Sequence, residues 1–513
     1  MKLQLYSQEV DSMNHCLAEG SVVSIKEPYL KVTSDAGFGL RIDHVSATKS
    51  WNFDLSADDW KLKGNEWFNK GNYHYANDWA LEASPSADEA ITIRLNRALT
   101  HLRAHKFEVA LRDLDVQPAE PKLLEKALYR KAQALYHLGR FRGCSEQQKG
   151  KYNFKRMQVE AAKNFAPELD HATYVGPVVV KMTKSHGRGF FTTAAVKAGD
   201  LLLCEKAFAY AFYDANNRKH TLSMVINTET NVVSTHTQAQ LVVSIVQKLF
   251  KNPKMGEAFT NLHHGGYQPV RVSEADGLPV VDTFLLERIV SLNCFGCPLP
   301  SRGYHIETRG VEEAAPSFDE RFHSNGIWTA ASYLSHSCDS NSRRSFLGDV
   351  MVVRATCDMP ADTEVTFSYL SPEVDASNGA NAMMKPIDMK HWGFKCTCII
   401  CTDLVQTDKK QLRKRQRISE SLTKTFNSLS PANIESVITA LGETFRRPLS
   451  EVPDITRWNP AHFLAALYSS RGDPRKCIEF SLKGLASRGY VIEGGEIPGI
   501  NGKTSKHAKL VIN

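Results

Sequence analysis

Residues 60 to 145 contain an internal repeat with a step of 34 residues, and this feature restricts the fold of the chain more than any other. Two sets of repeated positions hold small residues, and one set holds aromatic rings. Small residues let paired helices approach closely, and rings fill the gap between neighbouring helix pairs. We therefore expect stacked helical hairpins in the first third of the chain. The three sets are Gly64, Ala98 and Ala132; Tyr73, Phe107 and Phe141; and Ala76, Ala110 and Cys144.

These hairpins resemble tetratricopeptide repeats, and we expect the array to span residues 56–166. The resemblance implies a groove in which a protein partner or a substrate docks. A scaffold that only packs on the next domain is the alternative. Ahead of the array, residues 1–55 alternate apolar and polar side chains around glycine and proline, which predicts short strands and irregular segments.

Length and composition indicate several domains and no membrane. A chain of 513 residues with 42% hydrophobic content can bury large cores, and two to four domains are expected. No apolar run approaches the roughly 20 residues of a spanning helix, and the N-terminus lacks the basic-then-apolar pattern of a secretory signal. We therefore expect an intracellular protein, in the nucleus, the cytoplasm or both.

The net charge of +7 is mild for this length and is partly concentrated in KKQLRKRQR, residues 409 to 417. A solvated helix face and a nuclear-localisation or nucleic-acid patch both fit such a run. Aromatic residues that could stack on bases are missing from it, which favours the solvated face. Direct binding of nucleic acid is therefore not expected.

Cysteines cluster tightly at one place in the sequence. Eleven cysteines in a reducing compartment are poor disulfide candidates, so a cluster indicates a metal or catalysis. Cys396, Cys398 and Cys401 form a Cys-x-Cys-x-x-Cys run. Their three thiolates are one ligand short of a closed tetrahedral zinc site, so a fourth must come from elsewhere in the chain.

A β-rich pattern begins after the break at residues 166–167 and is interrupted by helices. Apolar residues at three- and four-residue steps predict the helices. This succession of elements predicts an α+β fold with a helical insertion. The strand-like runs lie at 175–183, 187–212, 348–360 and 363–372, and the helical runs at 236–264 and 282–296.

Several short motifs follow one another between residues 186 and 401. The Gly-rich turn at residues 186–189 lets the backbone approach a ligand, although a simple hairpin uses glycines in the same way. SHSCDSN (335–341) follows a helix, EVTFSYL (364–370) ends a β run, and HWGFKCTCIIC (391–401) comes after it. In this order the motifs resemble a SET-domain lysine methyltransferase with a cysteine-rich post-SET segment. The resemblance is greatest to the SET-and-MYND (SMYD-type) enzymes and their fungal relatives that carry tetratricopeptide repeats.

The resemblance covers roughly residues 174 to 404 and implies a domain organisation. A SET domain with small, knotted sheets would span 174–373, with a helical insertion at about 206–326. A post-SET zinc segment would follow at 374–404, and a C-terminal helical domain at 405–513 would wall the substrate cleft. The fold class is therefore expected to be α+β, with helices flanking the SET domain on both sides.

The resemblance implies S-adenosylmethionine as methyl donor. Asn293 would lie near the amino-acid end of the donor, and Phe394 would pack on its adenine ring, which stabilises by about 1 kcal/mol. Backbone contacts would come from the Gly-rich turn and from the first residues of SHSCDSN. The donor-contacting residues implied in this way are His186, Arg188, Gly189, Asn293, Ser335, His336, Tyr369 and Phe394.

Tyr369 is the catalytic residue that the resemblance implies, with its hydroxyl at the inner end of a lysine channel. Methyl transfer to a neutral amine is an in-line displacement, so orientation and deprotonation are the main demands on the protein. An apolar channel beside a sulfonium cation lowers the lysine pKa from about 10.4. Trp392 and Phe394 match the aromatic residues that line the channel. Without the resemblance, Tyr369 would be read as a packed strand tyrosine.

The resemblance also supplies the missing zinc ligand, which is the cysteine of the His-Ser-Cys motif, here Cys338. The ion would hold the post-SET segment over the site, and the channel would depend on metal to fold. His336 would then be structural and donor-contacting. A Cys/His nucleophile pair is the competing interpretation, although no oxyanion motif accompanies it. The implied zinc ligands are Cys338, Cys396, Cys398 and Cys401.

The chain departs from the family pattern in several places. Ser335 replaces an asparagine and offers fewer hydrogen bonds to the donor, and Ser340 replaces a proline, while Asn341 is in place. The MYND finger is missing, because Cys294 and Cys297 form one pair without a second, which is typical of buried core cysteines.

Two functions are compatible with these residues. One is an S-adenosylmethionine-dependent protein-lysine N-methyltransferase that acts on histone or other protein lysines. The alternative is a catalytically degenerate SET and repeat adaptor that only mediates protein-protein interaction, which the serine at position 335 keeps open.

Overall fold

The structure is a computed structural model of the 513-residue chain. It forms two compact units, Met1–Ala134 and Leu135–Asn513. In the described part of the chain, no helix is both long enough and apolar enough to cross a membrane. The structure describes residues 2–5, 22–25, 29–32, 38–42, 48–51, 57–73, 76, 87–139, 147–161, 168–183, 187–214, 224–275, 278–297, 322–369, 388–425, 430–448, 451–452, 457–487, 492–493 and 509–510.

Short strands open the first unit. In one sheet, β4 (Phe38–Ile42) pairs in parallel with β1 (Lys2–Leu5) and antiparallel with β3 (Tyr29–Val32). A separate antiparallel pair consists of β2 (Val22–Ile25) and β5 (Thr48–Trp51). The segment with alternating apolar and polar residues therefore contains β structure.

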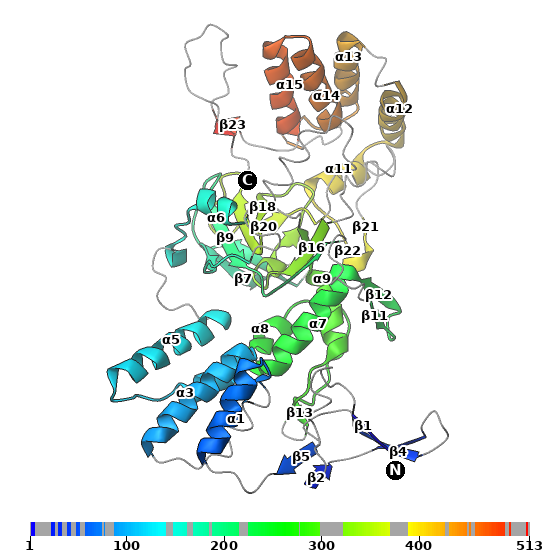
Figure 1. The fold of residues 1–513 in the computed structure, drawn as a ribbon. Helices are drawn as coiled ribbons and strands as arrows, with labels where there is room; N and C mark the ends of the chain where they lie inside the picture. The colour runs from blue at the N-terminus through cyan, green and yellow to red at the C-terminus, as the bar shows by residue number, and fades with distance from the viewer. Residues whose placement is uncertain are drawn as a thin grey trace. The chain divides into compact units, whose positions relative to one another are not determined.

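Helices follow these strands, and two of them keep the spacing of the sequence repeat. Helix α1 (Ala57–Asn69) comes first. Helix α5 (Pro121–His137) begins 34 residues after the start of α3 (Ala87–Arg103). Between them, α4 (Phe107–Asp113) packs on α3. Figure 1 shows α1, α3 and α5. The resemblance to tetratricopeptide repeats stays a prediction.

Small residues let these helices pack closely. Ala98 of α3 and Ala110 of α4 are fully buried, as the repeat predicts. In α5 the buried alanines are Ala127 and Ala134, which lie two turns apart on one face. The repeat instead pointed to Ala132, which is exposed. The sequence register therefore misses the buried face of α5 by two residues.

Two four-stranded sheets form the β-rich centre of the second unit. They are ordered β17-β20-β8-β7 and β18-β19-β9-β6. Their shared core is apolar and includes Phe190, Leu203, Trp328 and Val365. Together with the helices before and after them, these small sheets confirm the α+β fold class. The strands are β6 (Tyr174–Val175), β7 (Val178–Met182), β8 (Arg188–Thr192), β9 (Leu201–Lys206), β17 (Ser335–His336), β18 (Ser342–Leu347), β19 (Val350–Ala355) and β20 (Glu364–Phe367).

The SHSCDSN segment begins as β17 and lies against β20 of the same sheet. Strand β17 runs parallel to β20, with Ser335 opposite Thr366. Asn341 then bonds the backbone of β20 on both sides of one residue: its Nδ2 donates to the Glu364 carbonyl at 2.8 Å, and its Oδ1 accepts from the Thr366 N–H at 2.8 Å. These pairings bring the motif against the segment that leads into Tyr369.

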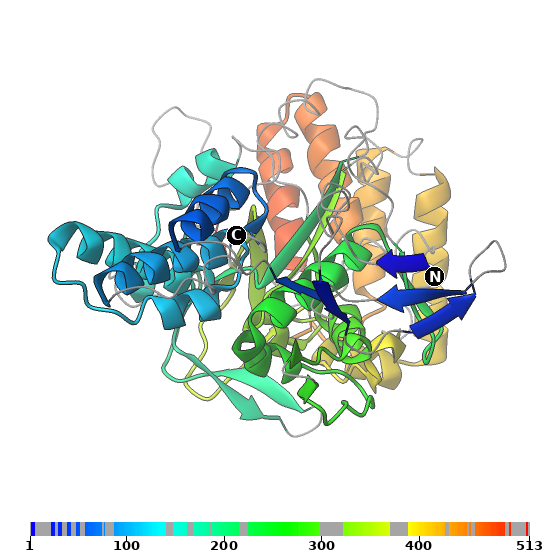
Figure 2. The same cartoon turned by 60° about the horizontal axis from the view of Figure 1, so that its bottom comes forward.

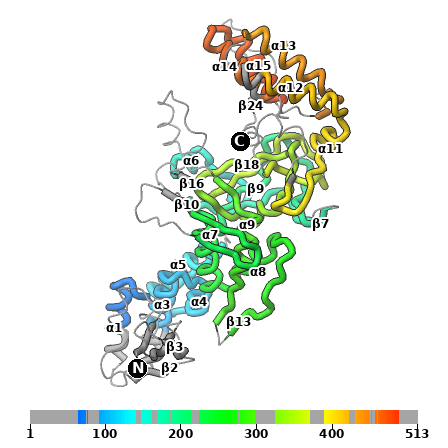
Figure 3. The backbone as a smooth tube through the Cα atoms, turned by 90° about the vertical axis from the view of Figure 1, so that its right-hand side faces the viewer, coloured from blue at the N-terminus to red at the C-terminus, as the bar shows by residue number. Residues whose placement is uncertain are grey.

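An insertion of helices and short strands separates β9 from β17. Its core is formed by buried residues of α7 and α9, among them Leu241, Ile245, Leu286 and Ile289. Figure 3 shows α7, α8 and α9 packed together. The elements are β10 (Ala209–Asp214), β11 (Met224–Asn227), β12 (Val232–Thr235), α7 (His236–Lys251), η4 (Pro253–Met255), α8 (Gly256–Thr260), β13 (Glu274–Ala275), β14 (Leu278–Pro279), α9 (Thr283–Asn293), β15 (Phe295–Cys297), β16 (Phe322–Ile327) and η5 (Ala331–Tyr333).

Helices end the second unit, and α12 to α15 lie side by side (Figures 1 and 2). Their core contains Ile434, Leu464 and Phe480. Two elements precede β6, namely η3 (Gln147–Lys149) and α6 (Phe154–Ala161). The elements after β20 are β21 (Asp388–Met389), η8 (Lys390–Trp392), β22 (Phe394–Lys395), α11 (Ile399–Gln406), α12 (Lys409–Thr425), α13 (Pro431–Gly442), α14 (Trp458–Ser470), α15 (Pro474–Ser487), β23 (Ile492–Glu493) and β24 (Lys509–Leu510).

The basic run lies on α12 and is not wholly solvated. Lys409, Lys410 and Arg417 are exposed, but Arg415 is fully buried. The Arg415 guanidinium donates to the hydroxyl and the carbonyl of Thr444 at 3.0 and 2.9 Å. One member of the run therefore anchors the helix instead of facing water.

Candidate functional site

One cavity of about 500 Å³ collects residues that are far apart in the sequence. They come from the Gly-rich turn, the end of α9, the segment around β17 and the post-SET segment. His186 lies outside the described residues, and Gly189 lies next to the lining without being part of it. The other predicted residues of the donor pocket and channel line the cavity: Arg188, Asn293, Ser335, His336, Tyr369, Trp392 and Phe394.

Gly189 has a packing role behind this lining. A Cβ atom at Gly189 would come within 2.9 Å of Glu364 Oε1 and Thr183 Cγ2, and within 3.1 Å of Ser335 Oγ. A side chain there would have to displace the Glu364 and Thr183 side chains, and it would crowd Ser335. Ser335 itself is buried. The glycine therefore lets β8 and β17 approach, while Gly187 and Arg188 face the cavity.

Arg188 ties the Gly-rich turn to the helical insertion. Its guanidinium donates to the carbonyl of Asn261, which follows α8. The same group lies over the ring of Tyr333, 5.1 Å from its centre. Both contacts hold the rim of the cavity in one position.

Asn293 presents an acceptor at the end of α9. It is buried, and its Nδ2 donates to the carbonyls of His263 at 2.7 Å and Ile289 at 2.8 Å. Both amide protons are therefore used. The Oδ1 atom is the polar group of the side chain that remains for a ligand, and a carbonyl oxygen suits an ammonium group.

His336 contacts both the segment that follows β20 and the cysteine cluster. The backbone N–H of Tyr369 donates to His336 Nδ1 at 3.1 Å, so a neutral imidazole carries its proton on Nε2. Nε2 lies 3.5 Å from Cys338 Sγ. Because Nδ1 is occupied by a main-chain donor, this geometry disfavours a general-base role for His336 and the competing Cys/His nucleophile pair.

The hydroxyl of Tyr369 donates to the carbonyl of Leu334 at 2.8 Å. Burial raises the pKa of this phenol, and the nearby Glu364 carboxylate raises it further, against a smaller lowering by Arg344. The phenol is therefore protonated at neutral pH. Its oxygen keeps lone pairs for a further donor.

Aromatic rings surround Tyr369. The ring centres of Phe367 and Trp392 each lie 5.2 Å from its own, and that of His336 lies at 5.3 Å. Phe394 lies beyond His336, with 6.4 Å between the ring centres. Such spacings are typical of packed aromatic pairs. The inner part of the cavity is therefore an apolar, aromatic enclosure.

The post-SET segment is fastened to the end of α9. Trp392 Nε1 donates to the Leu292 carbonyl at 3.0 Å, and His391 Nε2 lies 2.8 Å from the Ser291 carbonyl. The last carbonyls of a helix have no partner within the helix, so they are available to such donors. Gly393, with φ of +79°, then turns the chain between Trp392 and the β22 strand.

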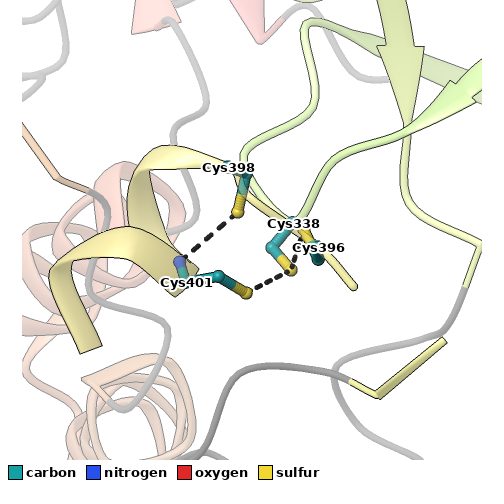
Figure 4. A group of neighbouring side chains, drawn as sticks. All are labelled: Cys338, Cys396, Cys398 and Cys401. Carbon is teal, nitrogen blue, oxygen red and sulfur yellow. Dashed lines mark hydrogen bonds between the residues drawn. The ribbon is translucent and has the colours of Figure 1, made fainter. Parts of the chain in front are cut away.

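Four cysteines converge beside the cavity (Figure 4). All four Sγ atoms lie within 4.8 Å of one another, and Cys338 Sγ lies 3.8 Å from Cys396 Sγ and 3.7 Å from Cys401 Sγ. A tetrahedral zinc site with bonds of about 2.3 Å places neighbouring sulfurs about 3.8 Å apart. Hydrogen bonding with Cys338 lowers the pKa of the Cys398 thiol, which favours a thiolate. The donor set fits zinc.

Cys294 and Cys297 stand apart from this cluster. Cys297 is buried, and its Sγ lies 3.1 Å from Ser324 Oγ. Burial raises the pKa of its thiol to about 12. Cys294 accepts a hydrogen bond from Gln238 Nε2 at 3.2 Å. Cys297 is therefore a buried core cysteine, as expected, whereas Cys294 is only partly buried and lines the cavity.

Glu205 supports the site in a way that the sequence motifs do not reveal. Its buried carboxylate accepts from the N–H groups of Ala330 at 2.8 Å and Ala331 at 2.9 Å, at the start of η5. Burial raises its pKa to about 7. Since η5 leads directly into Leu334, Glu205 positions the carbonyl that holds Tyr369. Its only signal in the sequence is an isolated acid within an apolar strand.

Arg344 is a second unforeseen residue, and it lines the cavity. Its Nη1 donates to the Ser368 carbonyl at 2.8 Å, and its guanidinium lies 4.7 Å from the centre of the Phe367 ring. Burial lowers its pKa to about 10. A cation therefore stands next to the aromatic enclosure.

Comparison with known proteins identifies the family. Residues 187–370 match the SET domain family. The chain is also 31% identical to a protein named "Methyltransferase" from Gibberella zeae over 540 aligned residues, which cover 94% of this chain and 73% of that relative. The chain belongs to the SET-domain methyltransferases.

The SET domain of this methyltransferase begins within the Gly-rich turn and ends one residue after Tyr369. It contains Cys338, whereas the other three cysteines follow it. Trp392 and Phe394 also lie outside it. Much of the aromatic wall is thus contributed by a segment beyond the matched domain, and the cysteine cluster joins that segment to the SET domain.

Proposed function

We propose that this methyltransferase is an S-adenosylmethionine-dependent protein-lysine N-methyltransferase with one structural zinc ion. The observation that carries the proposal is the convergence in one cavity of Asn293, the β17 segment and the post-SET aromatics around the Tyr369 hydroxyl. Asn293 offers an acceptor for an ammonium group at one part of the cavity, which suits a zwitterionic donor. The aromatic enclosure at another part suits a lysine side chain.

Zinc would be held by the four clustered cysteines. As a closed site with four thiolate ligands it would be structural, with no open position for catalysis. The cysteines would fix the start of α11 against the SHSCDSN segment. Residues 390–395 are carried on the same stretch, so the cluster would keep Trp392 and Phe394 in the wall of the cavity.

The residues around the cavity also fit the donor. S-adenosylmethionine supplies a methyl group activated on a sulfonium. Asn293 Oδ1 would accept from the donor's ammonium group, and the backbone of Gly187 and Arg188 lies open to its polar atoms. Phe394 offers a ring face for the adenine. The buried Ser335 hydroxyl would stand where the family has an amide.

The aromatic enclosure would favour the neutral form of the lysine amine. An ε-amine has a reference pKa of about 10.4 and must be neutral to act as a nucleophile. Apolar walls and the nearby Arg344 cation both disfavour the ammonium form and lower that pKa. Because the Tyr369 phenol keeps its own proton, its role is to orient: the hydroxyl is fixed on Leu334, and its free lone pairs accept from the amine.

We also propose that the N-terminal helices dock a protein partner or the substrate in the manner of tetratricopeptide repeats. We propose an intracellular location, in the nucleus or the cytoplasm. The alternation of small buried residues in α3 and α4 supports a repeat array.

The proposal is tested by transfer of a labelled methyl group. The full-length, zinc-replete protein is incubated with labelled S-adenosylmethionine and with histones or lysate proteins, and the products are mapped by mass spectrometry. Label on lysine ε-nitrogen is expected. Label only on other residue types would contradict lysine as the acceptor, and no transfer to any protein would contradict the proposed activity.

A further inference from the structure

A second cavity, of about 380 Å³, lies in the helical insertion and shares no lining residue with the first. We call it the insertion pocket; it is formed by Val225 to Asn227 of β11, by α7 and by the start of α9. Its walls are mainly valine and phenylalanine side chains, and its volume lies within the range of about 300–1,000 Å³ of ligand pockets. The residues that carry the argument are Val225, Asn227, Val243, Val246, Phe284 and Glu287.

Glu287 places a carboxylate in this apolar lining. The side chain is 2% exposed, and its Oε2 accepts from Asn227 Nδ2 at 2.6 Å. Its Oε1 is buried and has no hydrogen-bond partner among the residues that the structure describes. Leaving such an oxygen unpaired costs about 1–3 kcal/mol, and more for a charged group. The pocket therefore contains an acceptor whose partner is missing.

Asn227 does not supply that partner in the structure. Its Oδ1 accepts from the N–H groups of Glu229 at 3.0 Å and Thr230 at 3.2 Å, which forms the turn between β11 and β12. The turn fixes the amide in an orientation in which Nδ2 donates to Oε2 and not to Oε1. Among the described residues, no ion pair involves Glu287 either.

The chemistry that completes this pocket is a cation on an apolar stem. A buried carboxylate is stabilised by a cation that also forms a hydrogen bond. Lysine and arginine carry such a group on an aliphatic stem, which packs on apolar surface. The valines and Phe284 would cover the stem, and Oε1 would accept from its charged end.

The surroundings of the pocket indicate that the cation belongs to a protein. Apolar side chains stay exposed on β11, on α7 and on β12, which pairs with β11: Met224 is 61% exposed, Val243 45% and Val233 51%. A free amine would leave this surface uncovered, whereas a polypeptide with apolar residues beside the basic one would bury it. We propose that the insertion pocket binds a lysine or arginine side chain of a protein partner, inserted between apolar neighbours.

Short capped peptides test this inference by fluorescence anisotropy on the full-length protein. One peptide carries lysine between valines, a second carries arginine, and a third carries norleucine, which keeps the stem without the charge. The lysine and arginine peptides are expected to bind at least about tenfold more tightly than the norleucine peptide. Glu287→Gln should abolish this difference, and Glu257→Gln, at an exposed acid of α8, should preserve it.

A second variant keeps the test valid if Glu287→Gln fails to fold. Val243→Trp fills the mouth of the pocket from a half-exposed position, so the charged peptides should lose binding while the melting temperature stays unchanged. Val180→Trp, on an exposed position of β7, is the matched control.

Several results would overturn the inference. They are equal binding of the lysine and norleucine peptides, discrimination that survives Glu287→Gln or Val243→Trp, and no binding at about millimolar concentration. Butylammonium chloride that binds as tightly as the lysine peptide would show a small-amine site instead of a protein site. None of these readouts depends on methyl transfer, so the inference stands or falls separately from the proposed function.

Discussion

At Tyr369, burial in the aromatic enclosure raises the pKa of the phenol, so the hydroxyl keeps its proton at neutral pH. That proton is used in the hydrogen bond to Leu334. A phenol held in this way can accept from a substrate amine but is a poor base. If lysine is the acceptor, as proposed above, its proton loss must be favoured by the cavity, through the apolar walls and the Arg344 cation.

Removing this hydroxyl should affect transfer more than donor binding. In Tyr369→Phe we expect the affinity for S-adenosylmethionine to change by less than about threefold, while the transfer rate falls by about 10²-fold, because orientation in the transition state is lost. Calorimetry and labelled-methyl transfer measure the two quantities. Tyr174→Phe, on β6 and outside the cavity lining, is the control. A mutant as active as the parent would exclude this role for Tyr369.

Glu205 should make stability depend on pH. The ordinary pKa of 4.5 is raised to about 7 in the folded protein, so the folded state holds a proton that the unfolded state has released. The stabilisation is complete below about pH 4.5 and is lost as the pH rises to about 7. We expect the melting temperature of the parent, relative to Glu205→Gln, to fall between pH 5 and pH 8. A difference in melting temperature between the two proteins that stays constant over this pH range would contradict the raised pKa of Glu205.

At the scale of elements, the post-SET segment depends on two fastenings. The cysteine cluster holds the start of α11, and Trp392 and His391 hold η8 on the terminal carbonyls of α9. The first fastening would be the proposed zinc site, and the second is hydrogen bonding. Their separate loss should have different consequences.

Loss of one cysteine should release the metal. Cys398→Ser removes one of four ligands, so we expect zinc content to fall from about one ion per chain to a small fraction, and amide exchange in residues 390–404 to quicken. Elemental analysis and hydrogen-exchange mass spectrometry measure both. Cys477→Ser, on α15 and outside the cluster, should keep its zinc. Unchanged zinc in Cys398→Ser would refute the site.

Loss of the indole N–H should have a milder effect. Trp392→Phe keeps an aromatic wall but leaves the Leu292 carbonyl without its donor, which costs about 1 kcal/mol. We expect KM for a substrate peptide to rise about fivefold with the zinc content unchanged. Steady-state kinetics on purified protein check this outcome. A KM equal to that of the parent would mean that the hydrogen bond does not position the wall.

At the scale of the whole molecule, the α+β class and the convergence of the cysteines could be predicted because the motifs keep the order of a known family. The roles of Glu205 and Arg344 could not, since a charge in a strand does not reveal a partner far away in the sequence. Arg415 was hidden in the same way within a basic run. The packing face of α5 was misplaced by two residues because the repeat register does not state which stripe of a helix is buried.

Titration of S-adenosylmethionine into the zinc-replete, full-length protein, followed by calorimetry, tests the central claim most directly. The claim is that separate segments of the chain form one donor pocket, and that a metal ion bound by the four cysteines keeps them together. We predict that about one donor binds per chain and that binding disappears when a chelator removes the zinc. A zinc-replete, folded protein that takes up no donor would contradict the account.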